Sequence, residues 1–474
     1  MRKLPTFKEL FKLSDLFFLI GFLPFAVIII IGQVYMQITD PDVIGFPLWV
    51  SIPCLVIMVG GWGVYLYLEL FKKKDDKQKF NLVVGGICAF LILLNIIIIL
   101  VQPKVITETV IIRFSKDHPE LVGTTSDAII PVSAIHKFMF IAEIIGVIMF
   151  VYIGLFIFPK RIKSVIFIKY LGFALFLFLT VLIIYGYIAD FDKYVAFFKH
   201  VFLNDRTDPD IYHKCVTSFI INRNAYGMCM MLGIIFAFIV HSIHRKWFYY
   251  LVAGFCFVNM IFSLCKTGII ISVIIMLVYV GYRLITTFKE HKKRNLIILI
   301  SFGSVALAIF TVIAASIISK GKFLSPIYSL YDELVRGGSS LDARTYIWDN
   351  TYQLLRDGNW LIGRGFGIIN LALQPMNIIS HEEKVFPTHS AYLSLVGEGG
   401  ILFLLAYLAL LVYSGYVIVK CFKKQPGLTL AMSLGVVSFV LYSFIETIHY
   451  LVYIFLFPIM VLYFSLQKEE KQIN

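Results

Sequence analysis

Residues 339–348 read Ser339-Ser340-Leu341-Asp342-Ala343-Arg344-Thr345-Tyr346-Ile347-Trp348 and lie in the middle of a polar stretch, residues 318–389. That stretch closes with Thr388-His389-Ser390-Ala391-Tyr392-Leu393 and leads into an apolar run that contains Gly397-Glu398-Gly399-Gly400. Elsewhere, apolar runs of membrane length follow one another through mostly shorter connections. Because long polar segments on a rigid scaffold commonly carry function, we expect the chemistry in residues 318–389 and the helix after them.

The composition is that of an integral membrane protein. The chain has 474 residues, of which 59% are hydrophobic and 15% are charged, and its mean hydropathy is +0.86. Soluble proteins are about 45–50% apolar and about 25% charged. The first apolar run is of full spanning length and lacks a small-residue cleavage site, so we expect no cleavable signal peptide. The seven cysteines are scattered without a Cys-x-x-Cys pair, which supports neither a disulfide framework nor a zinc site.

The apolar runs predict an all-α fold with about twelve spans, because a helix needs about 20 apolar residues to cross a membrane. The expected spans are 15–37, 47–71, 81–102, 138–158, 165–189, 219–240, 247–263, 267–282, 295–317, 390–418, 427–445 and 449–466. One large loop with short helices separates the ninth span from the tenth. The chain is thus expected to run through segments 1–214 (spans one to five), 215–317 (spans six to nine), 318–389 (the loop) and 390–474 (spans ten to twelve and a tail).

The basic residues predict the orientation. With twelve spans, 24 of the 42 lysines and arginines fall at the two termini and in short connections on one side. This is the positive-inside bias, so both termini are expected in the cytoplasm and the large loop outside. The formal net charge of +13 therefore indicates membrane topology, and we exclude nucleic acid as a partner.

Residues 342–356 have the pattern of a helix inside the loop. Ser339 or Ser340 can cap it, and Asp357-Gly358 ends it. Arg344 and Trp348 would share one face of this helix. From spacing alone, Arg344 is either a site residue or a solvated arginine paired with a nearby aspartate. The following run Gly363-Arg364-Gly365-Phe366-Gly367 fits neither a Walker loop nor a dinucleotide fingerprint, and we interpret it as a re-entry turn that packs close to the membrane.

Further polar residues stand at the expected outer ends of spans. His389 is either a cap of the tenth span or a general base. Glu398 lies within an apolar run, where a carboxylate is costly, so it should face the interior with a partner as structural glue or as a site residue. Arg223, Asn224 and Lys266 begin two other spans, where anchoring of a helix end is the ordinary role. Glu446 and His449 form a weaker candidate pair.

Four motifs in this order resemble the O-antigen ligase and polymerase family. They are Asn-Arg-Asn-Ala-Tyr-Gly (222–227), Ser-Leu-Cys-Lys-Thr-Gly (263–268), Arg-Thr-Tyr-Ile-Trp (344–348) followed by Gly-Arg-Gly-Phe-Gly (363–367), and His-Ser-x-x-Leu-x-x-x-Gly-Glu-x-Gly (389–400). The resemblance covers about residues 215–415. Lys266 departs from it, because the family usually has Ser-Arg where this chain has Cys265-Lys266.

The resemblance implies a glycosyltransferase at the outer face of the bacterial plasma membrane, with an oligosaccharide on undecaprenyl diphosphate as donor and no metal or cofactor. A polymerase of O-antigen, capsule or exopolysaccharide moves the glycan onto a new lipid-linked repeat, and a ligase moves it onto lipid A-core. Flippase and chain-length regulator proteins are the expected protein partners. His389 matches the family histidine as the catalytic base, and Arg344 matches its loop arginine. The expected substrate-binding residues are Lys266, Arg223, Arg364, Trp348, Asn224 and Glu398.

Other classes of protein stay open. A twelve-span polysaccharide transporter or flippase is disfavoured because the halves show no evident repeat and the polar residues gather at one face of the membrane. A non-catalytic scaffold of an export complex is a third possibility. Polymerase and ligase are two forms of one reaction class, and we prefer the polymerase because polysaccharide gene clusters commonly encode such proteins.

Overall fold

The structure is a computed structural model that describes residues 16–21, 24, 48–71, 78–111, 124–162, 166–202, 215–220, 223–288, 340–356, 359–369, 388–448 and 451–473. The chain divides into two compact units, each built from separate stretches of sequence. Unit 1 comprises residues 1–165, 340–421 and 439–474, and unit 2 comprises residues 166–339 and 422–438.

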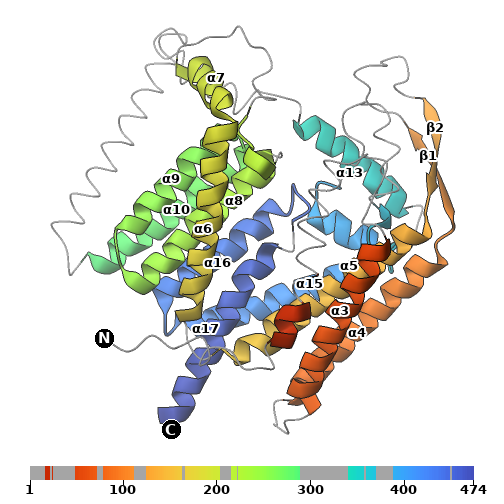
Figure 1. The fold of residues 1–474 in the computed structure, drawn as a ribbon, viewed down its shortest axis with the longest axis horizontal. Helices are drawn as coiled ribbons and strands as arrows, with labels where there is room; N and C mark the ends of the chain where they lie inside the picture. Colours follow the sequence, from red (N-terminus) through yellow and green to blue (C-terminus); the bar gives the residue numbers. More distant parts are fainter. Residues whose placement is uncertain are drawn as a thin grey trace. The chain divides into compact units, whose positions relative to one another are not determined.

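Among the described residues, helices occupy ten of the twelve apolar runs (Figure 1). They are α3 (Leu48–Leu66), α4 (Gln78–Val101), α5 (Ala134–Val151), α6 (Ile166–Ala189), α8 (Arg223–His244), α9 (Phe248–Phe262), α10 (Lys266–Thr287), α15 (Ala391–Phe422), α16 (Pro426–Tyr442) and α17 (Val452–Ile473). In this part of the chain seven helices are long and apolar enough to cross a membrane, while α9, α16 and an apolar part of α17 are shorter. The protein is a multi-pass membrane protein. The expected spans 15–37 and 295–317 lie mostly or wholly outside the described residues, so twelve spans stay a prediction.

The remaining described elements lie between these helices. A short helix, α7 (Phe191–Phe202), follows α6, and the expected loop helix is α13 (Ser340–Arg356). Short 3-10 and π-helical segments continue or precede several helices. Strands β1 (Val105–Ile111) and β2 (Thr125–Pro131) pair antiparallel, from Val105 opposite Pro131 to Ile111 opposite Thr125. This hairpin is the exception in an otherwise helical structure, and its β-branched run at residues 105–111 favours strand.

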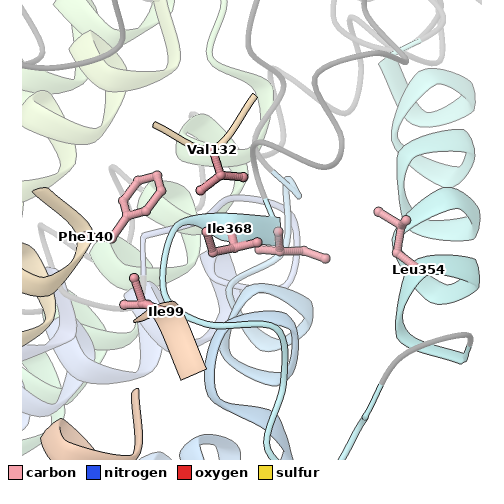
Figure 2. Packing of buried hydrophobic residues seen from close by; sticks show 6 residues of the cluster. Ile99, Val132, Phe140, Leu354 and Ile368 are labelled. Atoms are coloured by element: carbon pink, nitrogen blue, oxygen red, sulfur yellow. The ribbon is translucent and has the colours of Figure 1, made fainter. Parts of the chain in front are cut away.

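Unit 1 packs one apolar cluster beneath the hairpin and the loop helix. Its buried residues are Ile99, Val132, Phe140, Leu354, Ile368 and Ile369. Figure 2 shows Leu354 projecting from α13 toward Ile368. The cluster therefore joins the ends of α4 and α5 to two pieces of the polar loop. At the far end of these helices, Arg161 pairs with Glu69, which compensates two charges in a largely apolar unit.

Unit 2 is built around α8, whose residues are mostly buried by α6, α9 and α10 (Figure 1). Glycine permits this close packing. A Cβ on Gly233 would lie 2.6 Å from Leu179 Cδ1 and 2.8 Å from Cys256 Sγ, so a larger residue would require these two side chains of α6 and α9 to shift. Small residues at helix contacts are typical of membrane helices, because close backbone approach strengthens van der Waals packing.

A buried polar cluster closes one end of unit 2. Tyr194 of α7 and Tyr226 of α8 both donate to the Oδ1 of Asn259 in α9, at 3.2 and 3.4 Å. The Nδ2 of Asn259 donates to the carbonyl of Phe255. Burial raises the pKa of the Tyr194 phenol to about 12, so its hydroxyl stays protonated and donates at neutral pH. One amide thus connects three helices.

Replacing Asn259 with Leu should destabilise the protein. The two tyrosines also hydrogen-bond each other, so at least one hydroxyl would lose its acceptor in a buried site, which costs about 1–3 kcal/mol. We expect a clear fall in the thermal unfolding midpoint of the purified protein. Val258→Leu is the matched control, because Val258 is adjacent and 47% exposed. Equal midpoints for the two variants would contradict the role assigned to Asn259.

Candidate functional site

His389 stands directly before α15 and contacts a carboxylate from the turn that follows α16. Its Nδ1 lies 3.2 Å from Oε2 of Glu446. The His389 side chain is 22% exposed and that of Glu446 is 11% exposed. When Nδ1 carries the proton it donates to Glu446, and Nε2 is then the nitrogen that accepts a proton. The pair has the arrangement of a general base with an orienting carboxylate.

Two short turns hold this pair together. The N–H of Ala391 donates to the carbonyl of Ser443 at 2.8 Å, and the hydroxyls of Thr388 and Thr447 lie 3.5 Å apart. His389 itself has a positive φ of 46°. This left-handed conformation costs a non-glycine residue about 1–2 kcal/mol, and the contacts on both sides maintain it. Such strain is often found at functional sites.

The loop helix α13 docks beside His389. The indole Nε1 of Trp348 donates to the carbonyl of His389 at 3.3 Å. Arg344 lies one turn earlier on α13 and therefore on the same face of the helix. Its side chain lies outside the described residues. The structure thus brings the side chain of Trp348 to the backbone of His389, and residue 344 lies one turn earlier on the same helix.

The glycine-rich turn packs against a break in α15. Gly400 has φ 69° and ψ −168°, which interrupts the helix. The carbonyls of Gly397 and Glu398 accept hydrogen bonds from the N–H groups of Arg364 and Gly365 at 2.8 and 2.9 Å. A Cβ on Gly363 would lie 2.6 Å from the backbone nitrogen of Gly400. The turn therefore requires glycine both for positive φ and for this close approach.

Arg364 reaches from this turn to the end of α13. Its Nε and Nη2 both donate to the carbonyl of Leu354, at 3.2 and 2.9 Å. That carbonyl belongs to the last turn of the helix, where no intrahelical donor is available. The backbone of the turn is held from α4, because Gln102 donates to the carbonyl of Arg364 and Asn95 accepts from the N–H of Phe366. Arg364 thus anchors α13 to the turn.

Glu398 lies beneath the same turn and is 5% exposed. Ser394 donates to its Oε1 at 3.0 Å, and the backbone N–H of Gly367 also hydrogen-bonds the carboxyl. Glu143 of α5 is close enough to act on it electrostatically. The carboxyl of Glu398 therefore has partners, as the sequence predicted for an intramembrane acid, and these partners tie it to the turn.

A second group of predicted site residues lies in unit 2. Arg223 begins α8 and Lys266 begins α10. The two helix starts are adjacent, since the thiol of Cys265 contacts the carbonyl of Asn224 at 3.9 Å. Arg223 and Lys193 both act electrostatically on Cys215. Half-buried cations thus gather at this end of unit 2, an arrangement that suits an anionic ligand.

Residues 251–408 match a family model, Wzy_C, described as O-antigen ligase. Over this range the chain is similar to the O-antigen ligase family. The resemblance drawn from the motifs is thereby confirmed over this range, which includes Lys266 and the residues from Arg344 to Glu398. A search of curated proteins found no match.

The matched range contains most, but not all, of the candidate residues. Arg223 and Asn224 precede the matched range, and Glu446 follows it. In unit 1 the structure brings Trp348, His389 and Glu446 together, and it places Arg364 and Glu398 at the glycine turn instead. Arg223, Asn224 and Lys266 belong to unit 2.

Sequence reasoning gave too little weight to several polar residues inside or beside apolar runs. Glu446 was only a weak candidate, paired with His449, which lies outside the described residues. Asn95, Glu143 and Asn259 were not singled out. Each is a single polar residue within an apolar helix, and that isolation was the available signal, because unpaired polar groups are costly in a membrane.

Removing the guanidinium of Arg364 should loosen α13 within the matched range. A hydrogen bond from a charged donor contributes about 1.5–3 kcal/mol, so α13 amides in Arg364→Ala should exchange with deuterium roughly 10–100-fold faster. Arg364→Lys should restore part of the protection. Arg356→Ala is the matched control, because Arg356 is exposed on the same last turn. Similar exchange in Arg356→Ala and Arg364→Ala would show that Arg364 does not anchor the helix.

Proposed function

We propose that the protein is a membrane glycosyltransferase that transfers an oligosaccharide from undecaprenyl diphosphate onto another lipid-linked repeat unit. The observation that carries this proposal is the pairing of His389 with Glu446 within hydrogen-bond distance, next to the docked helix α13, with His389 inside the range that is similar to the O-antigen ligase family. Its expected setting is the outer face of the bacterial plasma membrane. The polymerase reaction needs only one class of substrate, because donor and acceptor are both lipid-linked glycans.

The proposed reaction is a displacement at the anomeric carbon. A hydroxyl oxygen of the acceptor sugar forms a bond to that carbon, and the bond from the carbon to the diphosphate oxygen breaks. His389 Nε2 accepts the hydroxyl proton, and Glu446 holds the ring and stabilises the imidazolium. The bonding electron pair leaves with undecaprenyl diphosphate.

The leaving group requires positive charge. Diphosphate oxygens match the planar fork of arginine, and Arg344 is the residue we assign to them. Its place on the Trp348 face of α13 puts it one helical turn from the contact with His389. Lys266, Arg223 and Asn224 stay candidates for a diphosphate- or glycan-binding group within unit 2. Trp348 offers an aromatic face to a sugar ring, in addition to its hydrogen bond.

The positions of Arg364 and Glu398 support a structural role instead of direct contact with the substrate. The guanidinium of Arg364 is occupied with the carbonyl of Leu354, and the carboxyl of Glu398 binds Ser394. We therefore propose that both act on the substrate through the position of the turn and of α13. This replaces the direct substrate contact predicted for them from the sequence.

Complementation of a deletion strain tests the function. Cells without the protein should accumulate single lipid-linked repeats, and the wild-type protein should restore a glycan ladder on a gel. Arg344→Ala and His389→Ala should fail at matched membrane levels, with an expected rate loss of about 10²–10⁴-fold for the base. Arg356→Ala, which removes an exposed arginine from the same helix, should still produce the ladder.

Other outcomes of this experiment distinguish the remaining functions. Long lipid-linked chains that never reach a final acceptor would identify the ligase reaction, which the description of the matched family favours. Unchanged glycans in the deletion strain would remove support for glycosyl transfer and favour a transporter. A ladder restored by His389→Ala at wild-type yield would reduce His389 to a structural cap.

Glu446 should act through His389, and a double-mutant cycle tests this. Glu446→Gln should lower the transfer rate of the purified enzyme because the amide no longer stabilises the imidazolium. Residues that act as one unit are not additive. The double variant Glu446→Gln with His389→Ala should therefore be no slower than His389→Ala alone. A further loss equal to that of Glu446→Gln in the wild-type background would assign Glu446 an independent role.

A further inference from the structure

Positively charged side chains surround the imidazole of His244 at one end of unit 2. At this end, α8 ends and α9 begins. His244 is the last residue of α8, and Arg245 and Lys246 follow it in a tight connection. Lys169, from the first turn of α6, lies at the same end. The charged groups of Lys169 and Lys246 both act electrostatically on the His244 ring. The three side chains therefore form one local group, which we call the basic corner.

The imidazole at the centre of the basic corner has one ring nitrogen without a hydrogen-bond partner. Nε2 of His244 is buried and makes no hydrogen bond within the part of the chain that the structure describes. The ring packs against Tyr249, with centroids 6.3 Å apart and planes 20° apart. A buried ring nitrogen without a partner is unusual in proteins. A ligand oxygen supplies the missing partner only when the side chains that cover this nitrogen move aside.

The positive charges of the basic corner lack nearby carboxylates in the described helices. Residues 166–189 and 223–288 contain no aspartate or glutamate. The acidic residues of α7 and its approach, Asp190 and Asp192, follow the opposite end of α6, roughly 30 Å away at the helical rise of 1.5 Å per residue. The N-terminus of α9 also has no side-chain cap and no acidic residue in its first turn, so its dipole adds positive potential that opposes the negative potential of the α8 C-terminus at His244.

Aromatic side chains surround the corner on the outside of unit 2. Trp247 is 70% exposed and Phe248 is 56% exposed. The ammonium of Lys169 lies 5.9 Å from the ring centroid of Tyr170 and 5.6 Å from that of Phe173. Aromatic rings beside lysines mark the level of lipid headgroups, where lysine stems run along apolar surface. A ligand here meets both cations and acyl chains.

We propose that the basic corner binds the phosphate of an anionic membrane phospholipid. Lys169 and Lys246 pair with the phosphate oxygens, and the imidazole of His244 donates its Nε2–H to one of them after the side chains that cover this nitrogen move aside. Trp247 and Phe248 contact the glycerol and upper acyl region. The charge distribution of the sequence predicts that this end faces the cytoplasm, where anionic lipids give the membrane surface its negative potential. The site does not depend on the glycosyl transfer proposed above.

Native mass spectrometry of the delipidated, purified full-length protein tests the proposal. The probes are phosphatidylglycerol, phosphatidylcholine and inorganic phosphate, each added to the same detergent solution. Phosphatidylglycerol should bind in preference to phosphatidylcholine. A lysine near an anionic headgroup contributes about fivefold in affinity. The double variant Lys169→Gln with Lys246→Gln should therefore weaken phosphatidylglycerol binding about 25-fold.

A second double variant, Lys420→Gln with Lys423→Gln, removes the same charge from another helix end. There Lys420 lies 5.5 Å from the Tyr416 ring. This control should bind phosphatidylglycerol nearly as well as wild type. Equal weakening in both double variants would overturn the proposal in favour of general charge attraction. Equal binding of the two lipids would also overturn it, and displacement of phosphatidylglycerol by millimolar inorganic phosphate would indicate a site for a free anion.

The contribution of the imidazole is tested separately. His244→Phe keeps a ring against Tyr249 but removes the N–H, and it should weaken phosphatidylglycerol binding several-fold. The thermal unfolding midpoint without lipid reports whether this variant is folded. If a folded His244→Phe protein binds phosphatidylglycerol like wild type, the two lysines alone form the site and the role given to His244 is wrong.

Discussion

The break in α15 needs hydrogen bonds that the helix cannot make for itself. In a bilayer, a backbone carbonyl or N–H without a partner costs several kcal/mol. Here the carbonyls of Gly397 and Glu398 accept from residues 364 and 365, and the N–H of Ile401 donates to the carbonyl of Trp360. The glycine turn therefore stabilises the broken helix, and the broken helix fixes the turn. These hydrogen bonds between the glycine turn and α15 fix the positions of several other segments of unit 1.

Three further contacts extend from this point to His389. Arg364 fixes the end of α13, Leu354 packs that end into the apolar cluster, and Trp348 joins the helix to the carbonyl of His389. His389 is held from the other side by Glu446 and by the hydrogen bond between residues 391 and 443. The general base that we propose at His389 must be held closely to be effective. Its strained backbone is consistent with a residue whose position is set by its surroundings.

Local patterns predicted much of the fold and part of the site. The apolar runs located ten helices, because spanning length and hydropathy are properties of a continuous segment. The loop helix was expected at 342–356 and lies at 340–356, and the turn at 363–367 has three glycines with positive φ. The pairing of His389 with Glu446 was not predicted, since 57 positions separate them and their contact depends on how α15 packs against the end of α16. The same holds for Arg364, whose chemistry suited phosphate but whose neighbour is a helix end.

The sequence by itself determined that this is a multi-pass membrane protein, and its motifs indicated the similarity to the O-antigen ligase family. Both conclusions rest on the composition and on short sequence motifs, which do not depend on how the chain folds. Only the tertiary structure decided which polar residues act as partners. In a membrane, each buried polar group needs a donor or acceptor from another segment. A local sequence pattern does not predict which segment supplies this partner. For this reason Glu398 and Arg364 were found to bind the protein itself, and Glu446 was found beside the histidine.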